Sequence, residues 1–162
     1  MKALIVYESF FGNTERIAQA IAQALGSPPE VELRRASEVQ PEQLRGLTLL
    51  VVGSPTRAFG PTPDTTALLK RIPGGALKGV KVAAFDTRIS ASDVKSAAAP
   101  LLRGLTKVFG WAAKPISDAL AKAGGEVVVP PEGFAVLASE GPLKEGELER
   151  AVAWAKQILA EQ

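Results

Sequence analysis

The sequence predicts an α/β protein built on a doubly wound, five-stranded parallel sheet. Short apolar runs alternate with segments of helical period, as in chains whose parallel strands are joined by helical crossovers. Three runs, Ala3–Tyr7, 47–52 and 81–85, are nearly continuous in apolar residues, as expected of strands covered on both faces. Val31–Arg35 alternates apolar with polar residues, which favours a sheet edge. The simplest arrangement has strand order 2-1-3-4-5.

The fifth strand is expected in two pieces, residues 127–129 and 134–137, separated by prolines and a glycine. Helical periodicity predicts five helices, at residues 17–25, 40–45, 64–72, 111–123 and 145–159. One apolar face of the last helix is expected to be buried, formed by Leu148, Ala151, Val152, Ala155 and Leu159.

Residues 89–109 do not follow this alternation. Ser92 is suited to cap a helix and Pro100 to start one. We interpret the segment as an insertion within a single domain of residues 1–162, which either covers the edge of a ligand or forms a dimer contact. Phe109 and Trp111 are expected in the core or an interface rather than against a ligand.

Composition excludes several kinds of chemistry. The 162 residues are 46% hydrophobic and 22% charged, as in globular proteins, and include no cysteine or histidine. Disulfides, the common zinc ligand sets and Ser-His or Cys-His nucleophiles are therefore excluded, so redox chemistry requires a bound cofactor. The net charge of +2 includes no basic block typical of a nucleic-acid-binding arm. Without a membrane-length apolar run or a secretory signal, we expect a cytoplasmic protein.

Three segments leave the carboxyl edge of the predicted sheet, where such folds bind ligands. The first reads Ser9-Phe10-Phe11-Gly12-Asn13-Thr14 and leads directly into a helix. Its hydroxyls and the backbone N–H groups of residues 11–14 are suited to surround one phosphate at the helix N-terminus. It has neither the lysine of a nucleoside-triphosphate loop nor a Gly-x-Gly-x-x-Gly pattern, so a terminal monophosphate fits better. The alternative is a tight turn at Gly12 followed by an ordinary helix cap.

The second segment reads Gly53-Ser54-Pro55-Thr56-Arg57-Ala58-Phe59-Gly60-Pro61. It offers a donor at Thr56, a cation at Arg57 and a ring at Phe59 on which a planar ligand can stack. The alternative is a rigid connector with Phe59 in the core.

The third segment, Asp86-Thr87-Arg88, offers polar groups to the edge of a planar ring. The alternative is a local cap or pair at Asp86 with Arg88 in solvent. Because all three segments converge on one location, we predict one ligand site there, with no catalytic side chain and no metal.

These motifs carry a family resemblance. Residues 9–14 resemble the phosphate loop of flavodoxins, and residues 54–60 resemble their isoalloxazine loop. The similarity extends over nearly the whole chain and implies a flavodoxin-like fold with FMN as cofactor. It implies that the phosphate is held by residues 9–14 and the ring by 56–60 and 86–88. The predicted cofactor-binding residues are Ser9, Phe10, Phe11, Gly12, Asn13, Thr14, Ser54, Pro55, Thr56, Arg57, Ala58, Phe59, Gly60, Asp86, Thr87 and Arg88.

The sequence also departs from the family pattern. Phe11 stands where many flavodoxins have a second threonine, and the third segment lacks the aromatic residue that often covers the flavin. Flavodoxins that carry electrons are usually strongly acidic, whereas this chain is slightly basic. This difference argues against docking to basic redox partners.

Electron transfer through FMN is the first functional hypothesis. The alternative is an FMN-dependent NAD(P)H:quinone-type oxidoreductase, because Pro55-Thr56-Arg57 and Phe59-Gly60 resemble flavodoxin-like quinone oxidoreductases and cations stabilise reduced flavin. The expected partner is a redox protein or a small quinone-like acceptor, with no nucleic acid and no membrane, and the chain is expected to be a monomer or a homodimer.

Two other classes of protein are alternatives to a flavin-binding protein. A response-regulator domain shares the strand order but needs an aspartate where this chain has Gly53 and Ser54. A flavin-free interaction domain remains an alternative.

Overall fold

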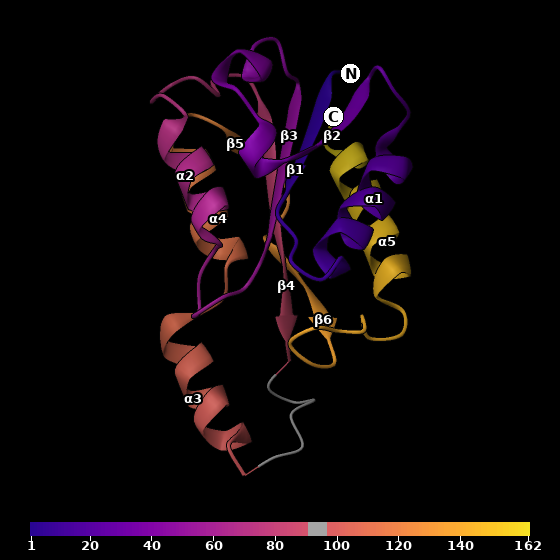
Figure 1. Cartoon of the computed structure of the whole chain (residues 1–162). Coiled ribbons are helices and arrows are strands. Elements are labelled where there is room, and N and C mark those ends of the chain that lie inside the picture. The colour runs from indigo at the N-terminus through magenta and orange to yellow at the C-terminus, as the bar shows by residue number, and fades with distance from the viewer. Residues whose placement is uncertain (91–96) are drawn as a thin grey trace.

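A parallel sheet forms the centre of the molecule (Figure 1), and the computed structural model describes residues 1–90 and 97–162. The strands follow the order β2-β1-β3-β4, and both β5 and β6 pair with β4. The predicted order 2-1-3-4-5 is therefore confirmed, with its fifth position shared by two short strands. The strands are β1 (Ala3–Tyr7), β2 (Val31–Arg35), β3 (Leu49–Pro55), β4 (Lys81–Ile89), β5 (Glu126–Val127) and β6 (Glu132–Val136).

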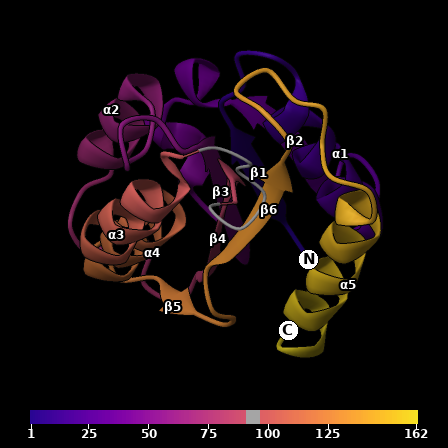
Figure 2. The same cartoon turned by 90° about the horizontal axis from the view of Figure 1, so that it is seen from below.

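Helices cover both faces of the sheet. α1 (Asn13–Leu25) and α5 (Glu147–Ala160) lie on one face, and α2 (Pro63–Arg71) and α4 (Ala113–Lys122) lie on the other (Figure 2). The chain also forms two 3-10 turns, η1 (Ala36–Glu38) and η2 (Pro41–Leu44), after β2. No helix among the described residues is long and apolar enough to cross a bilayer.

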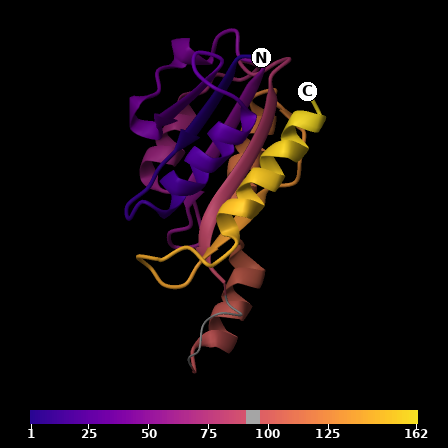
Figure 3. The same ribbon diagram turned by 90° about the vertical axis from the view of Figure 1, so that its right-hand side faces the viewer.

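α3 (Ala99–Phe109) extends beyond the carboxyl edge of the sheet (Figure 3). Pro100 lies in its first turn, as predicted, and Ser92 lies outside the described residues. The predicted insertion of residues 89–109 therefore contains a helix, but Ile89 itself is the last residue of β4.

A cluster of three aromatic rings fixes the centre of the core between the sheet and α5. Phe85, Phe134 and Trp154 meet edge to face, with ring centroids 6.0–6.2 Å apart. A Cβ on Gly53 would lie 2.0 Å from the ring of Phe85, so only glycine fits at that position of β3. This glycine keeps the strand close to the ring just before the chain enters the second site segment.

The buried face of α5 differs from the predicted one. Ala151 and Ala155 are buried as expected, but Trp154 and Ile158 are buried with them. The predicted residues Leu148, Val152 and Leu159 are only partly buried. The predicted buried face was wrong by a small rotation of the helix about its axis, because the ring of Trp154 packs against those of Phe85 and Phe134.

Candidate functional site

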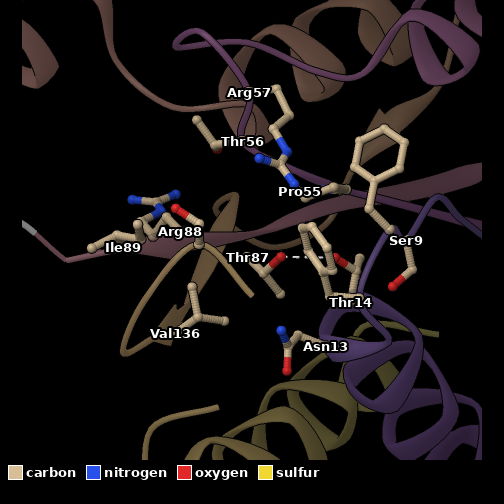
Figure 4. Close-up of a pocket in the computed structure, with 13 residues that line it drawn as sticks. Ser9, Asn13, Thr14, Pro55, Thr56, Arg57, Thr87, Arg88, Ile89 and Val136 are labelled. Carbon is tan, nitrogen blue, oxygen red and sulfur yellow. Dashed lines mark hydrogen bonds between the residues drawn. The ribbon is translucent and has the colours of Figure 1, made fainter. Parts of the chain in front are cut away.

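A pocket lies at the carboxyl ends of β1, β3 and β4, where the sequence predicted a ligand site (Figure 4). Ten predicted residues line it, namely Ser9, Phe10, Phe11, Asn13, Thr14, Pro55, Thr56, Arg57, Thr87 and Arg88. Six predicted residues are not on its wall, namely Gly12, Ser54, Ala58, Phe59, Gly60 and Asp86. Sequence reasoning missed three that are, namely Ile89, Val136 and Ser139.

The first segment turns sharply into α1. Gly12 has φ 88°, in the left-handed region that favours glycine, and its N–H donates to the Ser9 hydroxyl at 3.0 Å. The N–H groups of the next three residues have no acceptor earlier in the helix. They give the pocket hydrogen-bond donors and the positive end of the helix dipole.

Two threonine hydroxyls meet beside these donors. Oγ1 of Thr14 and Oγ1 of Thr87 are 2.7 Å apart, and both residues are buried. Because only one hydroxyl donates in this bond, the other keeps its hydrogen for a further acceptor. The pair therefore joins the first segment to β4 and retains one donor.

Arg35, the last residue of the neighbouring strand β2, binds the first segment and the start of α1. Arg35 donates to Oε1 of Glu8 at 3.0 Å, to the Ser9 carbonyl at 3.2 Å and to Oε2 of Glu15 at 3.4 Å. The other oxygen of Glu15 accepts from the Tyr7 hydroxyl at 3.0 Å. Burial, together with this hydrogen bond, raises the pKa of Tyr7. None of the three charged residues lines the pocket.

Hydroxyl groups hold the second segment in place. The Ser54 hydroxyl accepts from the N–H of Thr62 at 3.0 Å, and the Thr56 hydroxyl accepts from the N–H of Ala112 at 3.0 Å. Ser54 is fully buried, so its role is structural. Thr56 lines the pocket but uses its oxygen to bind the start of α4.

A tight two-residue turn ends this segment. Arg57 and Gly60 exchange two backbone hydrogen bonds of 2.8 and 2.9 Å, and the residues between them have positive φ, 46° at Ala58 and 65° at Phe59. Such turns favour Asn-Gly, so two ordinary side chains here store strain.

We expect Ala58→Gly to raise the free energy of unfolding by about 1 kcal/mol, because glycine adopts positive φ without the Cβ clash. Chemical denaturation of the apoprotein measures the change. As a control, Ala121→Gly in α4 should instead lower stability by about 1 kcal/mol. A loss of stability in both variants would contradict the strained turn.

Arg57 lies close to two aromatic rings that line the pocket with it. Its guanidinium carbon is 5.1 Å from the ring centroid of Phe10 and 5.3 Å from that of Phe11. The two rings are 54% and 49% exposed, which is unusual for phenylalanine. None of the ion pairs between described residues includes Arg57. Within the part of the chain that the structure describes, its positive charge is therefore not paired with a carboxylate.

The third segment was predicted to leave the edge of the sheet, which was wrong, because it is part of strand β4. Residues 85–89 of β4 pair in register with residues 132–136 of β6. Asp86 is fully buried and binds Arg88 through both oxygens, at 2.6 and 2.7 Å. It also accepts from the N–H of Ala113 at 2.8 Å. Burial raises the pKa of Asp86, although Arg88 and this N–H oppose the change.

The guanidinium of Arg88 is closely packed against an aromatic ring and a glycine. It lies 4.6 Å from the ring centroid of Trp111, and a Cβ on Gly133 would come within 2.2 Å of its central carbon. Trp111 thus packs over an ion pair at the site rather than in the core. Arg88 lines the pocket with its charge already neutralised by Asp86.

The segment after β6 closes the remaining side of the pocket. Nδ2 of Asn13 donates to the carbonyl of Glu140 at 3.0 Å, and a Cβ on Gly141 would lie 2.7 Å from the same nitrogen. Ser139 reaches the pocket from this segment. Its position was foreseeable, because it follows a strand that ends at the same edge of the sheet.

The donors and walls of the pocket fit a flat ligand with an anionic tail. N–H groups and hydroxyls gather at the start of α1, whereas Phe10, Pro55, Ile89 and Val136 give apolar walls. Within the described ranges, no group of three or more acidic, histidine or cysteine side chains is placed to hold a metal ion.

The family model described as Flavodoxin matches residues 5–154. The chain belongs to the flavodoxin family. Flavodoxins bind FMN and transfer electrons through it to redox partner proteins, so FMN is the cofactor of this chain.

Individual relatives agree with this assignment. A flavodoxin from Picosynechococcus is 47% identical over 49 residues, a match that spans 30% of this chain and 29% of that relative. The crystal structure of oxidised flavodoxin 2 from Bacillus cereus superimposes with a TM-score of 0.76 at 22% identity, covering 100% of both chains. A flavodoxin from the domain Archaea gives 0.71 at 21% identity, covering 99% of this chain and 98% of its own. These structural likenesses show the flavodoxin fold.

Proposed function

We propose that this chain is an electron carrier that binds FMN in the pocket of Figure 4 and passes electrons to a partner protein. The observation that carries the proposal is the pocket itself. At one end it has the free N–H groups that open α1, and at the other it has apolar walls from β3, β4 and β6.

Each part of the pocket has a role toward the cofactor. The N–H groups of Asn13 and Thr14, the Ser9 hydroxyl and the spare hydrogen of the Thr14–Thr87 pair would bind the phosphate. Residues 55–57 and 87–89 would flank the ring. FMN, when bound, supplies electron-transfer chemistry that no side chain of this chain can supply.

The wall of the pocket favours a carrier over an enzyme. Among the described residues that line it, only Arg57 and Arg88 are ionisable, and arginine keeps its proton throughout the physiological pH range. None of these described side chains is thus suited to donate or remove a proton from a substrate. The cytoplasmic location and the monomeric or homodimeric state stay predictions from the sequence.

A quinone-type oxidoreductase is the second candidate, and it is favoured by the charge of Arg57, which pairs with no carboxylate of the described residues. Positive charge near the ring stabilises reduced, anionic flavin and so promotes two-electron chemistry. Arg88 does not add to this effect, because Asp86 neutralises it.

The experiment is an FMN titration of the apoprotein, followed by anaerobic reductive titration of the complex. We expect a yellow complex with a Kd of micromolar order or tighter, reduced in two resolved one-electron stages. We also expect no appreciable turnover of NADH or NADPH with quinones. Failure to bind FMN would overturn the proposal, whereas two-electron reduction with rapid quinone turnover would replace the carrier with the enzyme.

A further inference from the structure

Arg35 lies close to the first site segment without lining the pocket. It is the last residue of β2 and pairs in register with Tyr7 of β1. Its side chain is 37% exposed, and its guanidinium also lies 5.2 Å from the ring centroid of Tyr7. The arginine therefore acts on the pocket through its charge and through the residues it touches, without lining the pocket itself.

Two carboxylates lie directly behind the phosphate-binding residues. Oε1 of Glu8 accepts from the N–H of Ser9 at 2.9 Å, and the Glu8 side chain is only 7% exposed. Glu15 is in the first turn of α1, with its side chain 33% exposed. The charge of Glu8 is poorly screened by water and that of Glu15 is partly screened, and both would repel the phosphate of FMN.

Arg35 is the cation that offsets both carboxylates. It forms ion pairs with Glu8 at 3.0 Å and with Glu15 at 3.4 Å. It also donates to the Ser9 carbonyl, so both backbone groups of Ser9 are bonded away from the pocket. The cluster of Arg35, Glu8 and Glu15 carries a net charge of −1 with the arginine and −2 without it.

We propose that Arg35 is a positioning residue that sets the preference of this chain for FMN over riboflavin. It does so by offsetting part of the negative charge of Glu8 and Glu15 beside the phosphate-binding segment. The inference rests on the proposed function, in which residues 9–14 bind the phosphate. Riboflavin has the same ring without the phosphate, so the charge behind that segment acts on FMN and hardly on riboflavin.

The test compares the dissociation constants of FMN and riboflavin, measured by quenching of flavin fluorescence at low and physiological ionic strength. In Arg35→Gln we expect FMN to bind more weakly by on the order of tenfold, and riboflavin to change by less than about threefold. The FMN loss should shrink as salt is added. Restoring the charge balance in Glu8→Gln/Arg35→Gln should recover most of the FMN affinity.

Arg34→Gln is the matched control. Arg34 precedes Arg35 on the same strand and pairs with Glu32 at the surface, where both side chains are more than 40% exposed. The Arg34→Gln substitution removes the same formal charge as Arg35→Gln, but at a residue that does not line the pocket or touch the first site segment. We therefore expect both dissociation constants to stay within about twofold of wild type.

Glu8→Gln alone tests the idea with the opposite sign and does not depend on the folding of an Arg35 variant. Glutamine keeps an oxygen for the N–H of Ser9, and we expect FMN binding to tighten severalfold relative to riboflavin. An equal loss for both flavins in Arg35→Gln, or no gain in Glu8→Gln, would overturn the inference while leaving the proposed function intact. If wild type does not bind FMN, the proposed function itself fails.

Discussion

Replacement of Arg88 by methionine is expected to lower the free energy of unfolding by about 3–5 kcal/mol near neutral pH. The reason is that Asp86 is fully buried and both of its oxygens bind the guanidinium. Methionine fills similar space against Trp111 but provides no charge, so a buried carboxylate is left with the N–H of Ala113 as its remaining partner. Urea unfolding at about pH 7.5 measures the loss.

The loss should depend on pH in a defined direction. Burial raises the pKa of Asp86 above its ordinary value of 3.8, and Arg88 opposes that change. Without Arg88 the folded-state pKa rises further, so the folded protein holds a proton that the unfolded chain has released. Stability then falls as pH rises through this window. We expect the deficit of Arg88→Met to be smaller at about pH 5 than at about pH 7.5.

The double variant Asp86→Asn/Arg88→Met is the control. It removes both charges while asparagine still offers an oxygen to the N–H of Ala113. We expect it to recover much of the lost stability and to show little pH dependence over this range. A deficit in Arg88→Met that is the same at both pH values would argue against a buried, unpaired carboxylate.

This ion pair also explains why part of the site could not be predicted from the sequence. Polar residues after the apolar run at residues 81–85 are typical of a loop. Here Asp86 and Arg88 satisfy each other, and the strand continues to Ile89 because β6 pairs with it. Sequence polarity shows which residues need partners, but not that two of them are partners of each other.

Apolar patterns were more informative. The continuous runs of β1 and β3 and the alternation of β2 correctly placed these strands inside the sheet and at its edge. The topology then located the pocket, because parallel strands end at one edge. On α5, however, two rotations of the helix bury similar numbers of apolar residues. The ring cluster of Phe85 and Phe134 selects the one that buries Trp154.

Within the site, the type of each residue predicted whether it lies near the pocket better than it predicted what its side chain does there. Thr56 was predicted to offer a donor, and its hydroxyl oxygen accepts from the N–H of Ala112, as that of the neighbouring Ser54 accepts from the N–H of Thr62. Phe59, the ring predicted for a planar ligand, lies in a strained turn and is not among the residues that line the pocket. The exposed rings that line the pocket are those of Phe10 and Phe11, whose centroids lie 5.1 and 5.3 Å from the guanidinium carbon of Arg57.

Reversing the charge of Arg57 is expected to give the largest change in the redox properties of the bound cofactor. Arg57 lines the pocket and has no carboxylate partner among the described residues, unlike Arg88. Its charge favours the reduced, anionic form of the flavin. A change of two charge units across this partly exposed pocket amounts to about 2–5 kcal/mol, which lowers a two-electron midpoint potential by about 50–100 mV.

Potentiometric titration of the FMN complexes of wild type, Arg57→Glu, Arg57→Gln and Arg57→Lys measures this effect. We expect Arg57→Gln to give about half the shift of Arg57→Glu. Arg57→Lys should stay near wild type, because it keeps the charge although it loses the guanidinium contacts with the two phenylalanine rings. If Arg57→Lys shifted the potential as much as Arg57→Gln, these contacts rather than the charge would control it.

Lys122→Glu provides the matched charge reversal away from the site. Lys122 is an exposed residue in the last turn of α4, and it does not line the pocket. Because solvent screens exposed charges beyond about 8–10 Å at physiological ionic strength, we expect its variant to keep the wild-type potential. If Arg57→Glu left the midpoint potential at its low wild-type value, the flavin ring would lie out of reach of the Arg57 charge. The observation that favours two-electron quinone chemistry would then be removed.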